Sequence, residues 1–133
     1  MALVIACNTS KNAMSGNDPE KLNGSWTVDY LSAPGENWDS LYLTKKPEMN
    51  FSVADNRVTG TTSCNSFSGP IKIEGNKISF PEPFAMTRML CPGKGESVFL
   101  ETLKKVNTYS TDGKTLNFIM GDVAILRLVK RER

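Results

Sequence analysis

Apolar and polar side chains alternate along most of the chain from Leu22 onward, which is the pattern of strands with one buried face. The alternation comes in short pieces, whose apolar members are Trp26, Val28 and Tyr30; Leu41 and Leu43; Met49, Phe51 and Val53; Ile71 and Ile73; Ile78 and Phe80; and Leu116, Phe118 and Met120. Turn-forming residues separate the pieces, most clearly at residues 74–77 (EGNK) and 111–114 (TDGK). Residues 123–129 (VAILRLV) predict a well-buried last strand. The pattern therefore predicts about eight short antiparallel strands.

One segment follows a helical period instead. In residues 96–106 (ESVFLETLKKV), Phe99, Leu103 and Val106 recur at positions i, i+4 and i+7. This spacing predicts one amphipathic helix of about three turns. Together the elements predict a mainly β fold, that is, a β-rich α+β domain. We expect a small antiparallel β-barrel or rolled sheet covered by the helix, because closure removes exposed strand edges.

The first 21 residues do not share this pattern. Residues 2–6 are apolar and end at Cys7, and the run is too short to cross a bilayer, which takes about 20 residues. Residues 4–7 (VIAC) resemble the lipobox of bacterial lipoproteins, in which the cysteine is lipidated; the alternative is an accidental apolar start with an inert thiol. Residues 8–20 are rich in Asn, Ser, Gly, Asp and Pro, which predicts a flexible tether.

These features divide the chain into a lipobox remnant with its tether, residues 1–21, and one folded domain, residues 22–133. A chain of 133 residues is the length of a single domain. We expect a lipid anchor at Cys7 to hold the domain on a membrane of the bacterial cell envelope. The expected location is the outer membrane, with the domain facing the periplasm or exposed on the surface.

Composition excludes several classes of function. The chain has no His, so it lacks the commonest general base, the Ser-His and Cys-His pairs and most catalytic zinc sites. The net charge is +2, and the short Lys and Arg clusters have no aromatic residues between them, so nucleic acid is not an expected partner. No phosphate-binding loop or nucleophile elbow is present. We expect no enzymatic activity, no cofactor and no metal.

The three cysteines favour a disulfide. If Cys7 is lipidated, Cys64 and Cys91 remain as a pair in a compartment where a disulfide persists. That bond would close a loop of roughly 27 residues and contribute about 3.5 kcal/mol. The alternatives are two buried thiols, a redox couple or half of a metal site. A zinc site would need carboxylates or a second chain, because the sequence offers no His and no fourth Cys.

Four stretches of sequence resemble the META domain family, also called the HslJ-like heat-shock family. They are residues 22–26 (LNGSW), 60–69 (GTTSCNSFSG), 87–92 (TRMLCP) and 96–100 (ESVFL) with Leu103. The resemblance covers Leu22 to about Lys130. The family often has Gly before the first cysteine and Ala before the second, where this chain has Ser63 and Leu90. The resemblance implies a small antiparallel barrel with one helix, frequent occurrence in envelope lipoproteins, a link with stress or antibiotic tolerance, and no established enzymatic activity.

A second resemblance concerns Gly24-Ser25-Trp26, which is similar to the Gly-x-Trp that opens the first strand of lipocalin-like barrels. It implies a lipocalin-like topology, in which an Arg from the last strand packs over the Trp ring. Arg127 lies in the last apolar strand, so we predict a cation–π contact between Arg127 and Trp26. The alternative is that Trp26 is plain core and Arg127 faces solvent.

Two functional hypotheses follow. The first is a non-enzymatic envelope lipoprotein that binds a partner protein or a small apolar ligand. Its ligand form predicts an apolar cavity lined by Trp26, Phe51, Phe67, Phe80 and Met120. The second is a thiol- or serine-dependent envelope enzyme, built on the two cysteines or on a Ser-Lys pair. The segment around Asn65 is interpreted as a turn, and Arg88 as an anion-binding or solvated charge.

Overall fold

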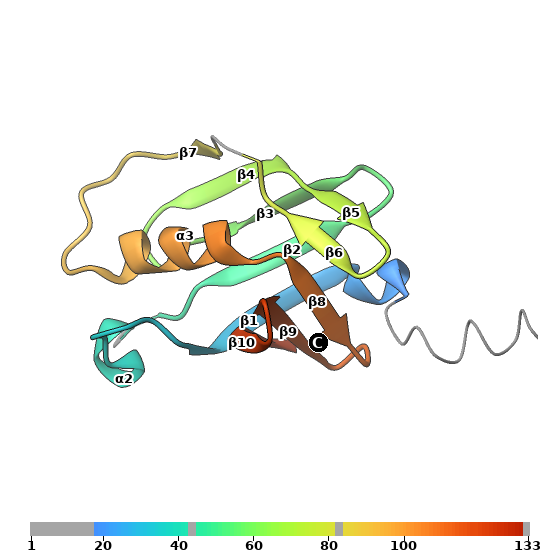
Figure 1. Cartoon of the computed structure of the whole chain (residues 1–133). Coiled ribbons are helices and arrows are strands. Elements are labelled where there is room, and N and C mark those ends of the chain that lie inside the picture. Colours follow the sequence, from blue (N-terminus) through green and yellow to red (C-terminus); the bar gives the residue numbers. More distant parts are fainter. Residues whose placement is uncertain (1–17, 43–44, 82–83, 132–133) are drawn as a thin grey trace, which may run out of the picture.

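The computed structural model describes residues 18–42, 45–81 and 84–131 (Figure 1). The predicted lipidation site at Cys7, the lipobox and the tether up to residue 17 lie outside the described residues. Residues 18–20, predicted as the end of the tether, are part of the fold. The Asp18 carboxylate accepts the Glu20 N–H at 3.0 Å and caps the 3₁₀ helix η1 (Pro19–Leu22), whose last residue, Leu22, is fully buried.

The described strands form one antiparallel sheet of ten strands in the order β5-β6-β8-β9-β10-β1-β2-β3-β4-β7. Their bounds are β1 (Gly24–Leu31), β2 (Glu48–Ser52), β3 (Arg57–Thr61), β4 (Ser66–Pro70), β5 (Lys72–Glu74), β6 (Lys77–Ser79), β7 (Ala85–Met86), β8 (Thr108–Thr111), β9 (Thr115–Met120) and β10 (Val123–Lys130). The first and last strands pair, as in an up-and-down barrel, and the sheet curls with β5 and β7 at its two edges (Figure 1). The predicted fold class is confirmed.

Ten strands replace the predicted eight because some are too short to show a period. β7 has only two residues, so it does not contain the repeated alternation that identifies a strand in a sequence. The two predicted hairpins are present: Glu74 pairs with Lys77 between β5 and β6, and Thr111 with Leu116 between β8 and β9.

The predicted helix is α3 (Gly95–Lys105), which begins and ends one residue earlier than expected. Phe99 and Leu103 are buried, and Val106, also buried, is its C-cap residue. Figure 1 shows α3 lying across the concave side of the curled sheet. The short helix α2 (Trp38–Leu41) contains Leu41, which the alternating pattern had placed in a strand. Within the described residues, no helix has the length and apolar character needed to span a bilayer.

Aromatic rings fill the interior of the sheet. Trp26, Phe51, Phe67 and Phe80 are all buried. Phe118 makes edge-on contacts with Phe51 and Phe80, at centroid distances of 6.1 and 5.5 Å. Four of the five residues that the sequence predicts to line a cavity, Trp26, Phe51, Phe67 and Phe80, are therefore core residues of the sheet.

Met120, the fifth residue of the predicted set, is not a core residue. It is the last residue of β9 and its side chain is 40% exposed. The alternation along β9 directs Met120 to the same face as Phe118, but the residue lies at the end of the strand beside the turn at Gly121. The core does not extend that far.

The predicted contact between Arg127 and Trp26 is also wrong. The register of β1 and β10 places Lys130 opposite Trp26, and the Lys130 Nζ lies 4.6 Å from the centroid of the indole ring. Arg127 is on the other face of β10, where its Nε donates to Asp29 Oδ1 at 2.9 Å and its guanidinium lies over Tyr30. The last strand does supply a cation to the indole, but its register selects the lysine.

Candidate functional site

A groove of about 410 Å³ opens between α3 and the segment that contains β7. We call it the α3 groove. Its floor is apolar and its rim carries charges of both signs. The residues that line it are Phe80, Phe84, Met86 and Arg88 on one side, and Glu96, Ser97, Leu100, Glu101, Leu103 and Lys104 on α3. Of the residues predicted to line a cavity, the groove contains Phe80 but not Trp26, Phe51 or Phe67.

Gly69 allows Phe84 to form one wall of the α3 groove. A Cβ atom on Gly69 would lie 2.5 Å from the Phe84 ring, which is closer than side chains approach. Phe84 instead lies against β4 and stacks on Phe67, with ring centroids 5.0 Å apart. Gly69 ends the stretch at residues 60–69, which contains Cys64-Asn65 and which we call the Cys-Asn motif. The close approach of Phe84, rather than an unusual backbone angle, explains why this position is a glycine.

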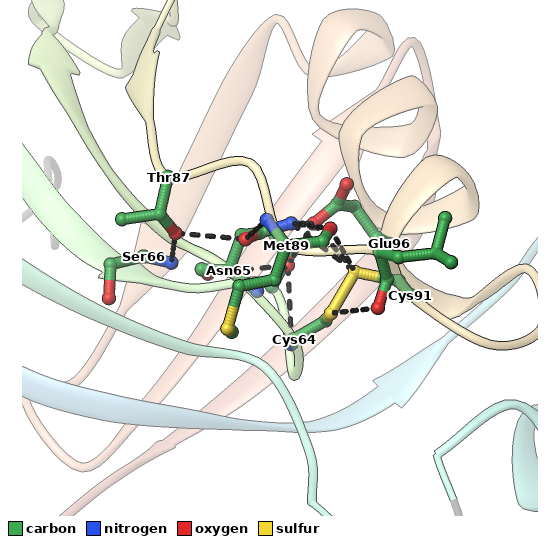
Figure 2. Close-up of a disulfide and its surroundings, with 9 residues drawn as sticks. Cys64, Asn65, Ser66, Thr87, Met89, Cys91 and Glu96 are labelled. Atoms are coloured by element: carbon green, nitrogen blue, oxygen red, sulfur yellow. Dashed lines mark hydrogen bonds between the residues drawn. A yellow bond between two sulfur atoms is a disulfide. The ribbon is translucent and has the colours of Figure 1, made fainter.

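The segment after β7 is attached to the domain by Asn65. We call residues 87–91 the strap (Figure 2). The side chain of Asn65 is buried, and its Oδ1 accepts hydrogen bonds from the Thr87 hydroxyl at 2.9 Å and from the Met89 N–H at 2.7 Å. Its Nδ2 donates to the Met89 carbonyl at 3.2 Å and to Glu96 Oε1 at 2.9 Å. Both ends of the amide are therefore satisfied, and one side chain connects the strap to α3.

Glu96 joins this network from the first turn of α3. Its Oε1 also accepts the hydroxyl of Thr62 at 2.7 Å, and that hydroxyl accepts the backbone N–H of Asn65 at 3.0 Å. A carboxylate in the first turn is favoured by the helix dipole. The turn at residues 62–65, the strap and the start of α3 are thus held by mutual hydrogen bonds.

A disulfide joins Cys64 to Cys91, whose Cα atoms are 6.0 Å apart and whose sequence separation is 27 (Figure 2). It connects the turn at residues 62–65 to the last residue of the strap. Cys64, Cys91 and Glu96 form a group with the spacing of metal ligands. The two sulfurs are bonded to each other, however, and the thiolate is the form that binds metals.

Tyr42 sets the position at which α3 begins. Its hydroxyl donates to the Gly95 carbonyl at 2.7 Å, and burial, with a smaller contribution from Glu36, raises the pKa of Tyr42 well above its usual value. A Cβ atom on Gly95 would lie 2.8 Å from the Tyr42 ring. The absence of a side chain at Gly95 therefore lets Tyr42 lie against the first residue of α3.

Sequence reasoning did not identify the α3 groove or the role of Asn65. The groove combines Phe80, Phe84, Met86 and Arg88 with one side of α3, whereas the helical period of the sequence identifies only which residues of that helix are buried. The sequence indicates a turn at Asn65. The signal for its wider role is its place in residues 60–69, one of the stretches that resemble the META domain family, as do residues 87–92, to which Asn65 bonds. Arg88 lies at the rim of the groove and has no acidic partner among the described residues.

Comparison with solved structures supports this fold. The chain is similar to a protein from Burkholderia xenovorans solved by NMR, with 18% identity, a TM-score of 0.67 and 89% of each chain covered. It is also similar to a DUF4847 family protein from Bacteroides vulgatus solved by crystallography, with 15% identity and a TM-score of 0.59, covering 84% of this chain and 95% of that one. No curated protein matches.

The family model of the META domain matches residues 20–133. The match includes the Cys-Asn motif, the strap and α3, and therefore all the elements that form the α3 groove. It begins two residues before the boundary predicted from the sequence. The chain belongs to the META domain family.

Proposed function

We propose that this protein is a non-enzymatic cell-envelope lipoprotein whose domain binds a partner protein or a small apolar ligand in the α3 groove. The observation that carries the proposal is the groove itself, at about 410 Å³ with an apolar floor. This volume is in the range of ligand-binding sites, which measure roughly 300–1,000 Å³. The resemblance to META proteins adds a link with stress or antibiotic tolerance to the proposal.

The anchoring of the strap supports binding in the groove. Asn65 and the disulfide hold the backbone beside one wall, and the stacking of Phe84 on Phe67 holds the wall itself. A site that is already formed loses little conformational entropy when it is occupied. The preference for binding over catalysis rests in part on the disulfide, because bonded sulfurs offer no thiolate nucleophile.

The lipid anchor is tested by the intact mass of the protein, expressed with its native signal in a bacterial envelope and extracted gently, with and without reduction. We expect acyl chains on Cys7, two hydrogens missing until reduction, and a Cys7→Ser variant that is not acylated. An unlipidated chain with three free thiols would contradict the proposed location and would favour the thiol-dependent enzyme.

Binding in the groove is tested with Leu100→Arg, which places a charge on the groove side of α3. The matched control is Thr59→Arg, at an exposed position on β3 outside the groove. We expect an apolar adduct seen by native mass spectrometry, or a partner crosslinked in the envelope, to be lost in Leu100→Arg and kept in Thr59→Arg. Equal retention in both variants would place binding elsewhere.

A further inference from the structure

The edge strand β7 has one paired side and one free side. It is the last strand of the sheet in the part of the chain that the structure describes, and it pairs only with β4, through Phe67 and Met86 and through Ser68 and Ala85. The pairing continues into the strap, where the Thr87 N–H donates to the Ser66 carbonyl at 3.0 Å.

The direction of the free backbone groups follows from this pairing. The N–H groups of Thr87 and Met89 face the β4 side, since they bond to Ser66 and to Asn65. Successive residues of an extended chain direct their backbone groups to alternate edges. The N–H and C=O groups of Met86 and Arg88 therefore face away from β4 and are available to another strand.

The free edge and the α3 groove lie together. Met86 and Arg88 line the groove, and α3 forms its other wall. An unpaired strand edge beside a groove walled by a helix is the arrangement in which domains such as PDZ and PTB bind peptides by adding a strand. Main-chain hydrogen bonds supply affinity there, and pockets for alternate side chains supply specificity.

We propose that the α3 groove binds an extended segment of a partner protein, which pairs as an additional strand with β7 at Met86 and with the strap at Arg88. This inference rests on the proposed function and specifies its occupant. The segment presents an apolar side chain to Phe84 and Leu100, and an acidic side chain to Arg88.

The charges at the rim determine the acidic preference. Lys104 is paired with Glu101 at 3.3 Å, and Glu96 is occupied by Asn65 and Thr62. Arg88 has no acidic partner among the described residues and its side chain is exposed. A carboxylate on the added strand would form a charge-assisted hydrogen bond with its guanidinium.

The exposed residues of the strap fit the same occupant. Leu90 is 98% exposed and Met89 is 61% exposed, although the backbone beside them is held by Asn65 and the disulfide. A segment longer than the two residues of β7 would extend along the strap toward these side chains. Because β7 has only two residues, its free edge alone offers few hydrogen bonds to an unrelated strand. Contacts with the groove and with Arg88 are therefore needed, and they select the partner.

The experiment selects ten-residue linear peptides from a random display library on the whole oxidised chain. The enriched peptides are then synthesised and their affinities measured by calorimetry. We expect alternating apolar residues with one Asp or Glu. We expect Arg88→Glu to weaken binding about tenfold or more, and exchange of the acidic residue of the peptide for Lys to restore it. The matched control is Lys114→Glu, an exposed lysine outside the groove, which should leave the affinity unchanged.

Two further measurements separate this inference from the proposed function. N-methylation of the alternate peptide residues whose N–H groups face β7 should abolish binding, because it removes the hydrogen-bond donors of the added strand. Failure to enrich any peptide, equal binding to Arg88→Glu, or equal binding of the N-methylated peptide would overturn the inference. Lauric acid is the second probe: if it binds the wild type and not Leu100→Arg while no peptide binds, the groove is a small-ligand site. If neither probe binds, the proposed function fails as well.

Discussion

The two halves of the sheet are held by different forces. Around β1 and β10, strands of eight residues pair on both sides and bury Trp26, Val28 and Leu128 completely. Around β7, a strand of two residues and the strap depend on Asn65, one disulfide and the stacking of Phe84. Burial is non-directional and spread over many residues, whereas hydrogen bonds fix geometry through few atoms. The molecule therefore combines a core that many buried residues stabilise with a strap whose position depends on a few residues.

The largest expected effect is in the core. Phe118→Ala removes a ring that contacts Phe51 and Phe80, and should lower the free energy of unfolding by about 4 kcal/mol. Denaturant unfolding measures this loss. The rate at which a protease cleaves the strap should rise only in proportion to the fraction of protein that is globally unfolded. Cleavage of the strap in a variant that is still folded would contradict the separation of the two regions.

The disulfide is expected to have the next largest effect. Replacing Cys64 and Cys91 together by Ala should cost about 3.5 kcal/mol if the unfolded chain gains the full entropy of the open loop. In contrast to Phe118→Ala, the strap should become the first site of proteolysis while near-ultraviolet circular dichroism of the core stays native. An unchanged cleavage pattern would mean that Asn65 alone holds the strap.

Asn65→Ala tests the hydrogen bonds directly. The change leaves the Met89 N–H and the Glu96 carboxylate without a partner that they have in the wild type. We expect a loss of about 2 to 3 kcal/mol, because the change removes several hydrogen bonds between partly buried groups, one of them to a carboxylate. Hydrogen exchange at Met89 should accelerate more than exchange at Leu128. The control is Asn50→Ala, on the exposed face of β2, which should change stability by less than about 0.5 kcal/mol.

One substitution should strengthen the strap region. Ser63 has a φ of 87°, in the left-handed region that favours glycine, and META proteins often have Gly at this position. Ser63→Gly should raise the free energy of unfolding by about 0.5 to 1 kcal/mol, because the relief of strain exceeds the added freedom of the unfolded chain. Ser40→Gly, at an exposed position of α2, is the matched control and should not stabilise. A destabilised Ser63→Gly would show that the strain is absent.

The smallest expected effect lies in the turn between β8 and β9. Asp112 Oδ1 accepts the N–H groups of Thr115 and Lys114, and these bonds lower the pKa of Asp112 below its usual 3.8. The carboxylate therefore stabilises the fold above the unfolded pKa, and this contribution disappears as the pH falls through the lower, folded pKa. Asp112→Asn should be slightly less stable than the wild type at pH 7 in thermal unfolding. The two melting curves should converge in acid, and a constant difference would contradict the sign.

The sequence by itself determined the class of the fold. Alternation is a local property of the chain. Trp26-Thr27-Val28 and Leu116-Asn117-Phe118 therefore indicate strands whichever strands they pair with. The stripe of Phe99 and Leu103 indicates a helix for the same reason. Cysteine parity favoured the pair Cys64 and Cys91 without any geometry, because it depends only on a count and a compartment.

Only the tertiary structure decided how distant residues meet. The register of β10 against β1 places Lys130, and not Arg127, at the Trp26 ring. Register decides this because a shift of one residue would move every side chain of the strand to the other face of the sheet. β7 is too short to carry a period, and its pairing with β4 lies beside a strap that Asn65 and the disulfide attach to residues distant in the sequence. The α3 groove arises where this strand meets the helix, because packing between elements, and not periodicity within one, creates a binding surface.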